Sequence, residues 1–171
     1  MSNIQTYMGK NYDVLTPRVE DVYIVDIAHA LSQLCRFGGH TKVFYSVAQH
    51  SVFVSRMVDP AFALQGLMHD AAEAYLCDLP RPIKQMMPQY SEIELKNLRV
   101  IFERFGVPWP LSPKVQEMDA VALATEARDV MGGMAFPWSP GADPSSDTIW
   151  PVKPTWAEML FLDRFDKLCS R

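Results

Sequence analysis

Apolar residues recur at helical spacing along most of this chain, while the alternation typical of half-buried strands is almost absent. In residues 26–37 (DIAHALSQLCRF) the aliphatic side chains fall on one face of a helix, and Asp26 is expected to cap its first turn. The two glycines that follow would end that helix. Ser46 is expected to cap a second helix that reaches about Val58. This periodicity predicts an all-α fold.

Proline and serine residues divide the middle of the chain into further helices. A third helix is expected over residues 60–76, and the three prolines within residues 77–90 interrupt the helical pattern after it. The string S-E-I-E at Ser91 matches a capping box, and Ser112 followed by proline is typical of another helix start. The sum is a compact bundle of six or seven helices, in a single domain over residues 1–171.

The C-terminal part combines a loop with a last helix. Residues 132–154 contain several glycines and prolines and are expected to form a surface loop or a lid. The segment TWAEMLFLDRFDKL then predicts an amphipathic helix, with Trp156, Leu160 and Phe161 docked on the core.

Composition narrows the class of protein. The chain is 49% hydrophobic and 21% charged, which is typical of a globular domain, and its net charge is −4 with no cluster of Lys or Arg. A nucleic-acid partner is therefore not expected. There is no apolar run long enough for a membrane span and no basic-plus-apolar leader at the N-terminus. Three widely spaced cysteines do not suggest a disulfide framework. We expect a cytoplasmic protein.

The string His69-Asp70-Ala71-Ala72-Glu73 carries the strongest chemical signal. Adjacent residues of a helix differ by about 100°, so the imidazole and the first carboxylate can lean toward one point, while Glu73 lies one turn further on the same side. Imidazole and carboxylate are ligands for divalent first-row metals, and a nearby free carboxylate can orient or deprotonate water. Alone, the His-Asp pair is a weak signal, and it is more often a buried, hydrogen-bonded histidine than a metal ligand.

Two further residues strengthen the metal interpretation. His50 lies in the string V-A-Q-H-S-V of the second expected helix. Asp119 is embedded in the apolar run M-D-A-V-A-L, where an unpaired carboxylate is costly to bury and requires a partner. A metal ion is one such partner, and an arginine or lysine is the alternative.

With these residues in place, the chain resembles the HD-domain phosphohydrolases. The string H-D-A-A-E-A-Y-L-C-D-L-P-R-P-I-K is similar to the pattern HD-x-x-E-x-x-x-x-D-L-P-x-P-x-K of the YfbR-like 5′-deoxynucleotidases and the phage dATP triphosphohydrolases. The Q-H-S around His50 and the M-D-A around Asp119 also fit, and the resemblance spans roughly residues 26–130.

The resemblance implies a single metal held by His50, His69, Asp70 and Asp119. This mixed nitrogen and oxygen set suits Co²⁺, Mn²⁺ or Zn²⁺, as well as Ni²⁺ or Fe²⁺, without choosing among them. The chain has four histidines, and none lies between the two aspartates. HD enzymes with two metals draw further histidines from that interval, so a dinuclear site of that kind is not expected.

The resemblance also implies catalytic roles. Glu73 would orient the attacking water or act as its base, and Asp78 would act as general acid toward the leaving nucleoside oxygen or organise water there. As an acid, Asp78 requires a raised pKa. The alternative for Asp78 is a turn carboxylate that caps the D-L-P-R-P loop.

Four residues are candidates for substrate binding. Arg36 resembles the family arginine that contacts substrate, while Phe37 takes the place of a tryptophan there and leaves the sugar selection open. Lys84 matches the family lysine that holds phosphate as a point charge. Arg81 would meet a longer polyphosphate or be a solvated loop residue. His29 is expected to be structural.

The expected function is metal-dependent hydrolysis of a deoxynucleoside triphosphate, dATP-like, with release of the nucleoside. The alternatives are a 5′-deoxynucleotidase acting on monophosphates, a phosphomonoesterase acting on another substrate, and an inactive HD fold that senses nucleotides. By the same resemblance, a homo-oligomer is expected.

Overall fold

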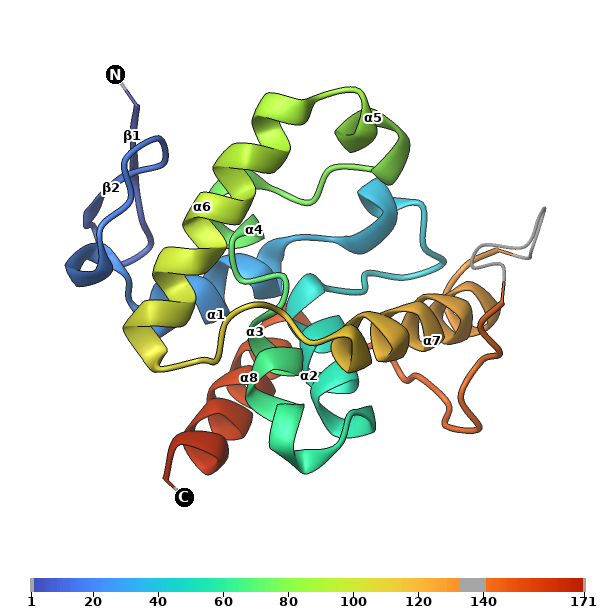
Figure 1. The fold of residues 1–171 in the computed structure, drawn as a ribbon. Coiled ribbons are helices and arrows are strands. Elements are labelled where there is room, and N and C mark those ends of the chain that lie inside the picture. Colours follow the sequence, from blue (N-terminus) through green and yellow to red (C-terminus); the bar gives the residue numbers. More distant parts are fainter. Residues whose placement is uncertain (1, 133–140, 171) are drawn as a thin grey trace.

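The computed structural model describes residues 2–132 and 141–170, and within them the chain is mostly helical, as predicted for an all-α bundle (Figure 1). The elements in chain order are β1 (Asn3–Gln5), β2 (Asn11–Asp13), η1 (Val19–Asp21), α1 (Ile24–Gln33), η2 (Arg36–Gly39), α2 (Val47–Met57), η3 (Pro60–Phe62), α3 (Ala63–Met68), α4 (Glu73–Leu76), α5 (Arg81–Gln85), α6 (Pro88–Phe105), α7 (Pro113–Asp129) and α8 (Pro154–Cys169).

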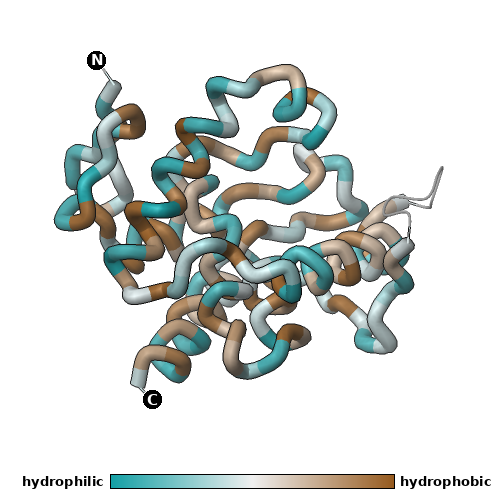
Figure 2. The backbone as a smooth tube through the Cα atoms, in the orientation of Figure 1, coloured by the Kyte–Doolittle hydropathy of each residue, from teal (hydrophilic) through white to brown (hydrophobic). Residues whose placement is uncertain are grey.

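The core lies where α1, α2, α3 and α8 pack against one another, with α7 against α2. Ile27, Leu31, Val47, Leu67 and Phe161 are fully buried there. Figure 2 shows apolar and polar residues alternating along the helices, as expected where one face of a helix packs on the core and the other faces solvent. Burial of these aliphatic and aromatic faces, about 25 cal/mol per Å² removed from water, is the main force that holds the helices together.

A glycine sets the distance between α2 and α3. A Cβ atom on Gly66 would lie 3.1 Å from the Cα of Ser55 and 3.1 Å from a methyl carbon of Val58. Any larger residue would therefore push the two backbones apart. The close approach matters because α2 carries His50, and His69 follows α3 directly.

The chain opens with a short antiparallel hairpin that the sequence pattern did not indicate. Strand β1 pairs with β2, and Ile4 lies opposite Tyr12. The hydroxyl of Tyr12 donates to Asn97 of α6, 2.7 Å away, and the backbone N–H of Met8 donates to Asp26. The prediction that Asp26 caps α1 is therefore wrong: it lies inside the first turn and binds the hairpin loop instead. The same helix ends at Gln33, earlier than expected.

The third expected helix is not continuous. Helix α3 ends at Met68 and α4 begins at Glu73, and residues 69–72 form tight turns between them. Here the backbone bonds reach three residues back, from Ala71 to Met68 and from Glu73 to Asp70, each 3.0 Å long. The change from helical to tighter turns falls on the His-Asp pair.

Of the other predicted helix starts, two are confirmed and one is wrong. The side chain of Ser46 caps α2 and that of Ser112 caps α7, as predicted. The capping box at Ser91 is wrong, because α6 already begins at Pro88, whose fixed φ suits the first helical position. Phe161 is buried as predicted, whereas Trp156 is 56% exposed and does not dock on the core.

The predicted loop over residues 132–154 is only partly described. Residues 133–140, on which the idea of a lid depends, lie outside the described residues. Residues 141–153 form no regular helix or strand, and Gln49 of α2 anchors them through hydrogen bonds to the carbonyl of Trp150 and the N–H of Val152. No helix in the described ranges is long and apolar enough to cross a membrane.

We predict that Gly66→Ala lowers the free energy of unfolding by about 1–2 kcal/mol, because overpacking against α2 outweighs the gain in helix propensity. Urea denaturation measures the change. Gly132→Ala is the control, since no atom of the described residues lies within 4 Å of its added Cβ. Equal stability of the two variants would show that the helix contact tolerates a methyl group.

Candidate metal centre

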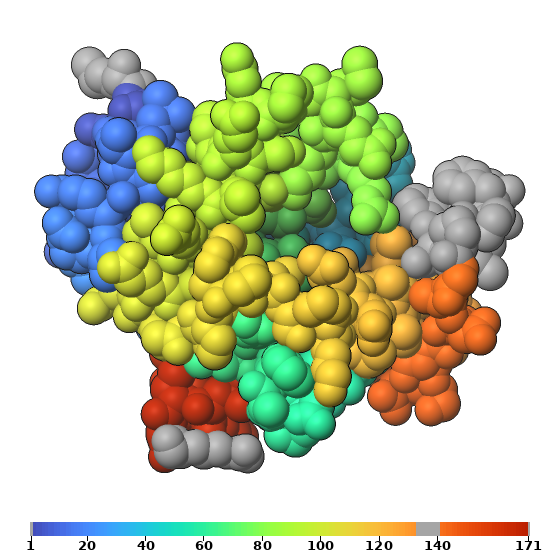
Figure 3. Space-filling view, viewed as in Figure 1, coloured from blue at the N-terminus to red at the C-terminus, as the bar shows by residue number. Residues whose placement is uncertain are grey.

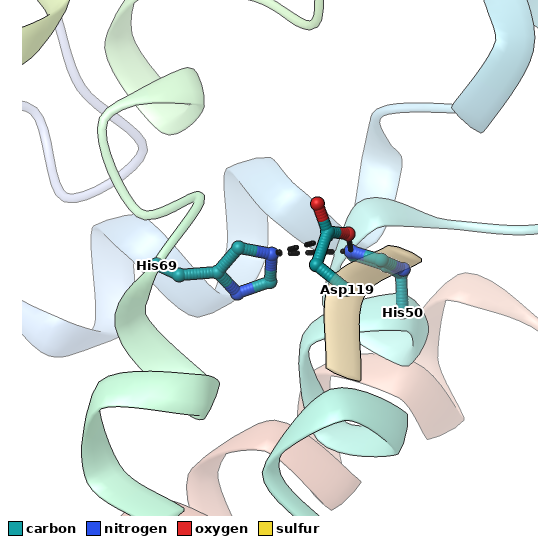
Figure 4. A group of neighbouring side chains, drawn as sticks. All are labelled: His50, His69 and Asp119. Atoms are coloured by element: carbon teal, nitrogen blue, oxygen red, sulfur yellow. Dashed lines mark hydrogen bonds and ion pairs between the residues drawn. The ribbon is translucent and has the colours of Figure 1, made fainter. Parts of the chain in front are cut away.

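Four predicted ligand atoms converge at the junction of α2, α3 and α7. The Nε2 atom of His50 lies 3.2 Å from Nε2 of His69, 3.2 Å from Oδ1 of Asp119 and 3.4 Å from Oδ2 of Asp70. The Nε2 atom of His69 lies 3.3 Å from Asp70 Oδ2 and 3.8 Å from Asp119 Oδ1. Figure 4 shows the two imidazoles and the carboxylate of Asp119 pointing toward one another.

These separations match those of ligands on one ion. Two atoms ~2.1 Å from a shared metal are ~3.0 Å apart at a right angle and ~3.4 Å apart at the tetrahedral angle. His50, His69 and Asp119 form a group that can hold a metal ion. Asp70 is not part of that group, but its Oδ2 atom lies 3.4 and 3.3 Å from the two imidazole Nε2 atoms. Two neutral imidazoles and two carboxylates balance the charge of a divalent cation. The identity of the metal is not encoded in this set.

The second nitrogen of each imidazole has its own acceptor. Nδ1 of His50 lies 2.6 Å from Oε1 of Glu126, and Nδ1 of His69 lies 2.8 Å from the carbonyl oxygen of Gly66. A carboxylate or carbonyl oxygen only accepts, so each ring carries its proton on Nδ1. Both Nε2 atoms are then available as ligands, an arrangement typical of metal-binding histidines.

The carboxylates govern the protonation of the metal-free site. Burial disfavours a charged His69, but Asp70 and Asp119 outweigh it and raise the pKa of this imidazole to about 10. Burial opposes ionisation of Asp119 too, yet hydrogen bonds from His50 and His69 keep its pKa well below the usual range. In the absence of a cation, protons on the imidazoles therefore balance the carboxylates.

A cavity of about 380 Å³ adjoins these ligands. Figure 3 shows the hollow between α6 and α7, with residues of the α3–α4 region on its floor. Its lining comprises His69, Asp70, Ala72, Glu73, Lys84, Ser91, Glu94, Leu95, Leu98, Leu111 and Asp119. The structure thus brings three of the predicted ligands, the predicted base and the predicted phosphate-binding lysine to one space.

Glu73, the predicted base, is buried at the cavity wall. The residue is 7% exposed, and its Oε2 atom has no hydrogen-bond partner within the described part of the chain. Burial, followed by the charges of Asp70 and Asp78, raises the pKa of Glu73 well above its ordinary value. A carboxylate whose basicity is raised this way is a stronger proton acceptor than a solvated one.

Asp78 follows a constrained residue. Cys77 has φ 70° and ψ 160°, a region that residues with a Cβ rarely adopt, and it directs the chain out of α4. Burial raises the pKa of Asp78, and the negative charge of Asp70 adds to that shift while Arg36 opposes it. This direction agrees with the predicted proton donor.

The predicted substrate-binding residues differ in their placement. Lys84 lines the cavity and forms an ion pair with Glu94, at 2.5 Å. Arg81 is exposed, outside the cavity lining. Arg36 is buried and pairs with Glu126 at 2.9 Å, and the ring of Phe37 lies 5.2 Å from its guanidinium carbon. The structure does not place Arg36, Phe37 or Arg81 with Lys84 at the cavity wall.

Glu126 is the site residue that the sequence analysis missed. It is fully buried and contacts both His50 and Arg36. Its position seven residues after Asp119 puts it on the same face of α7, two turns away. That spacing was the available signal, but a single glutamate in the string T-E-A-R is common on solvated helix faces.

Sequence comparison with known proteins shows to which family the chain belongs. The chain is 41% identical over 172 residues to the uncharacterized protein YfdR of Escherichia coli (strain K12), and the match covers 98% of this chain and 96% of YfdR. The chain belongs to the YfdR family. It is also 31% identical over 138 residues to an uncharacterized protein of Rhodobacter capsulatus, covering 72% of this chain and 70% of that protein. No family model matches the chain.

We predict that Zn²⁺ binding releases at least one proton per ion at pH 7. An imidazole with a pKa of about 10 is protonated there, whereas a metal-bound imidazole is not. Affinity should therefore rise with pH and fall as the pH is lowered. Isothermal titration in two buffers of different ionisation enthalpy counts the protons. His29→Gln is the control, because His29 pairs with Glu158 on α8, apart from the site. Binding without proton release would contradict this account.

Proposed function

We propose that this chain is a metal-dependent phosphohydrolase of the HD type that acts on deoxynucleotides, with a deoxynucleoside triphosphate as first candidate substrate. One observation carries the proposal: two imidazoles and two carboxylates approach one another beside a cavity whose lining includes a buried carboxylate, Glu73. The H…HD…D order of the sequence supports the same class. A binder alone would not need Glu73 and Asp78 together.

In the proposed reaction, Glu73, Asp78 and Lys84 each have a separate role. Glu73 orients a water molecule and accepts its proton as the oxygen attacks phosphorus. Asp78, whose pKa is raised, donates a proton to the nucleoside oxygen as the bond between phosphorus and that oxygen breaks. Lys84 moves from Glu94 to a phosphate oxygen. A divalent ion, which His50, His69, Asp70 and Asp119 would hold, would supply Lewis acidity.

A monophosphate is the second candidate because of the charges around the cavity. Among the described residues of its lining, Lys84 is the one lysine or arginine, and Asp70, Glu73, Glu94 and Asp119 are acidic. A bound divalent ion and a single lysine balance a monophosphate more readily than a triphosphate.

Product chromatography distinguishes the candidates. Each dNMP and dNTP is incubated with the protein and Co²⁺, Mn²⁺ or Zn²⁺. Nucleoside plus triphosphate identifies a triphosphohydrolase, whereas nucleoside plus orthophosphate from monophosphates alone identifies a 5′-nucleotidase. No release with any substrate and metal would refute the proposed activity.

We predict that Glu73→Gln lowers kcat by about 10²–10⁴-fold, because the amide cannot accept the proton of the attacking water. Zn²⁺ affinity should change little, since Glu73 is not among the ligands. Steady-state kinetics and metal titration measure the two effects. Glu92→Gln, an exposed residue of α6 outside the cavity lining, is the matched control. An unchanged kcat in Glu73→Gln would remove Glu73 from the reaction.

A further inference from the structure

A buried carboxylate on α7 links one predicted ligand to a buried arginine. Glu126 has no exposed surface. Its Oε1 atom accepts from Nδ1 of His50, at 2.6 Å, and its Oε2 atom accepts from Nη2 of Arg36, at 2.9 Å. Both oxygens are thus engaged, and the positive charge of Arg36 offsets the cost of burying the carboxylate.

The contact with His50 has a chemical consequence. An ionised carboxylate can only accept, so the facing ring nitrogen must carry a proton. His50 therefore holds its proton on Nδ1 and presents the lone pair of Nε2 to Asp119, Asp70 and His69. A carboxylate at this place also raises the basicity of the coordinating nitrogen.

The arginine of the Glu126–Arg36 ion pair also lies near a second predicted ligand, Asp70. Nη1 of Arg36 lies 3.8 Å from Oδ2 of Asp70. Arg36 therefore contacts both Glu126, which binds His50, and the predicted ligand Asp70. His69 is fixed differently, because its Nδ1 donates to the backbone carbonyl of Gly66. The orientation of His50 depends on side chains, whereas that of His69 depends on the backbone of α3.

We propose that Glu126 is a positioning residue of the metal centre, which holds His50 in its metal-binding tautomer, and that Arg36 supports this buried carboxylate. The inference rests on the metal centre of the proposed function and is independent of the substrate. It gives Arg36 a task that the family resemblance does not imply, since the guanidinium lies within the protein against two carboxylates.

Glu126→Gln tests the proposal with little change in shape. The amide must present its NH₂ group either to His50 or to Arg36. Facing His50, it requires a bare Nδ1 and moves the ring proton to Nε2, where it competes with metal. Facing Arg36, the amide NH₂ group meets the N–H of Nη2, so that a donor faces a donor and the hydrogen bond is lost. We expect Zn²⁺ affinity, measured by isothermal titration, to fall about 10–100-fold.

The matched control is Glu158→Gln. Glu158 also faces an imidazole nitrogen, Nδ1 of His29 at 3.1 Å, but that histidine lies outside the predicted ligand set. Its Zn²⁺ affinity should equal that of the wild type. Equal affinities for Glu126→Gln and the wild type would overturn the proposal.

A measurement on the wild type decides the matter even if Glu126→Gln does not fold. In Zn²⁺-loaded protein with ¹⁵N-labelled histidine, long-range ¹H–¹⁵N spectra should show His50 protonated at Nδ1 and coordinated through Nε2. Coordination through Nδ1 would overturn the inference. Wild-type protein that binds Zn²⁺ but hydrolyses no nucleotide would refute the proposed activity alone, whereas absence of Zn²⁺ binding would refute both.

Discussion

The close approach of α2 and α3 is the constraint on which the rest of the site depends. Because Gly66 has no side chain, its backbone lies against Ser55, and the imidazoles of His50 and His69 come within 3.2 Å of each other. The carbonyl of the same glycine orients His69. Helix α7 then packs against α2 and brings Asp119 to the two rings. A packing contact between backbones thus sets the spacing of atoms that are able to bind one ion.

Charge balance is the second organising feature. The site gathers several carboxylates, and Asp70, Asp119 and Glu126 each have a cationic or hydrogen-bonding partner there. Arg36 contacts Glu126 and approaches Asp70, while both imidazoles approach Asp119. Buried charges persist in proteins when they are paired in this way. A divalent cation would replace protons that the imidazoles hold in its absence.

The sequence predicted the helical class and the grouping of His50, His69 and Asp119, because periodicity and short motifs are local signals. It did not predict features that depend on distant partners. The hairpin is held by the contact of Tyr12 with Asn97, and Asp26 binds the hairpin loop although it resembles a cap. Glu126 resembles a surface residue until the fold places it beside His50. The start of a helix was ambiguous where a proline and a serine could each mark it, as Pro88 and Ser91 do for α6.

The ligand atoms come from segments far apart along the chain, with His50 in α2 and Asp119 in α7. An ion bound by both residues would cross-link α2 and α7, and its binding site would exist only in the folded chain. Its free energy of binding would add to stability, by about 2.7 kcal/mol at a free concentration one hundred times the dissociation constant. The lifetime of the protein against proteolysis would then follow the supply of metal, so that scarcity of the ion would reduce the amount of protein as well as the fraction loaded.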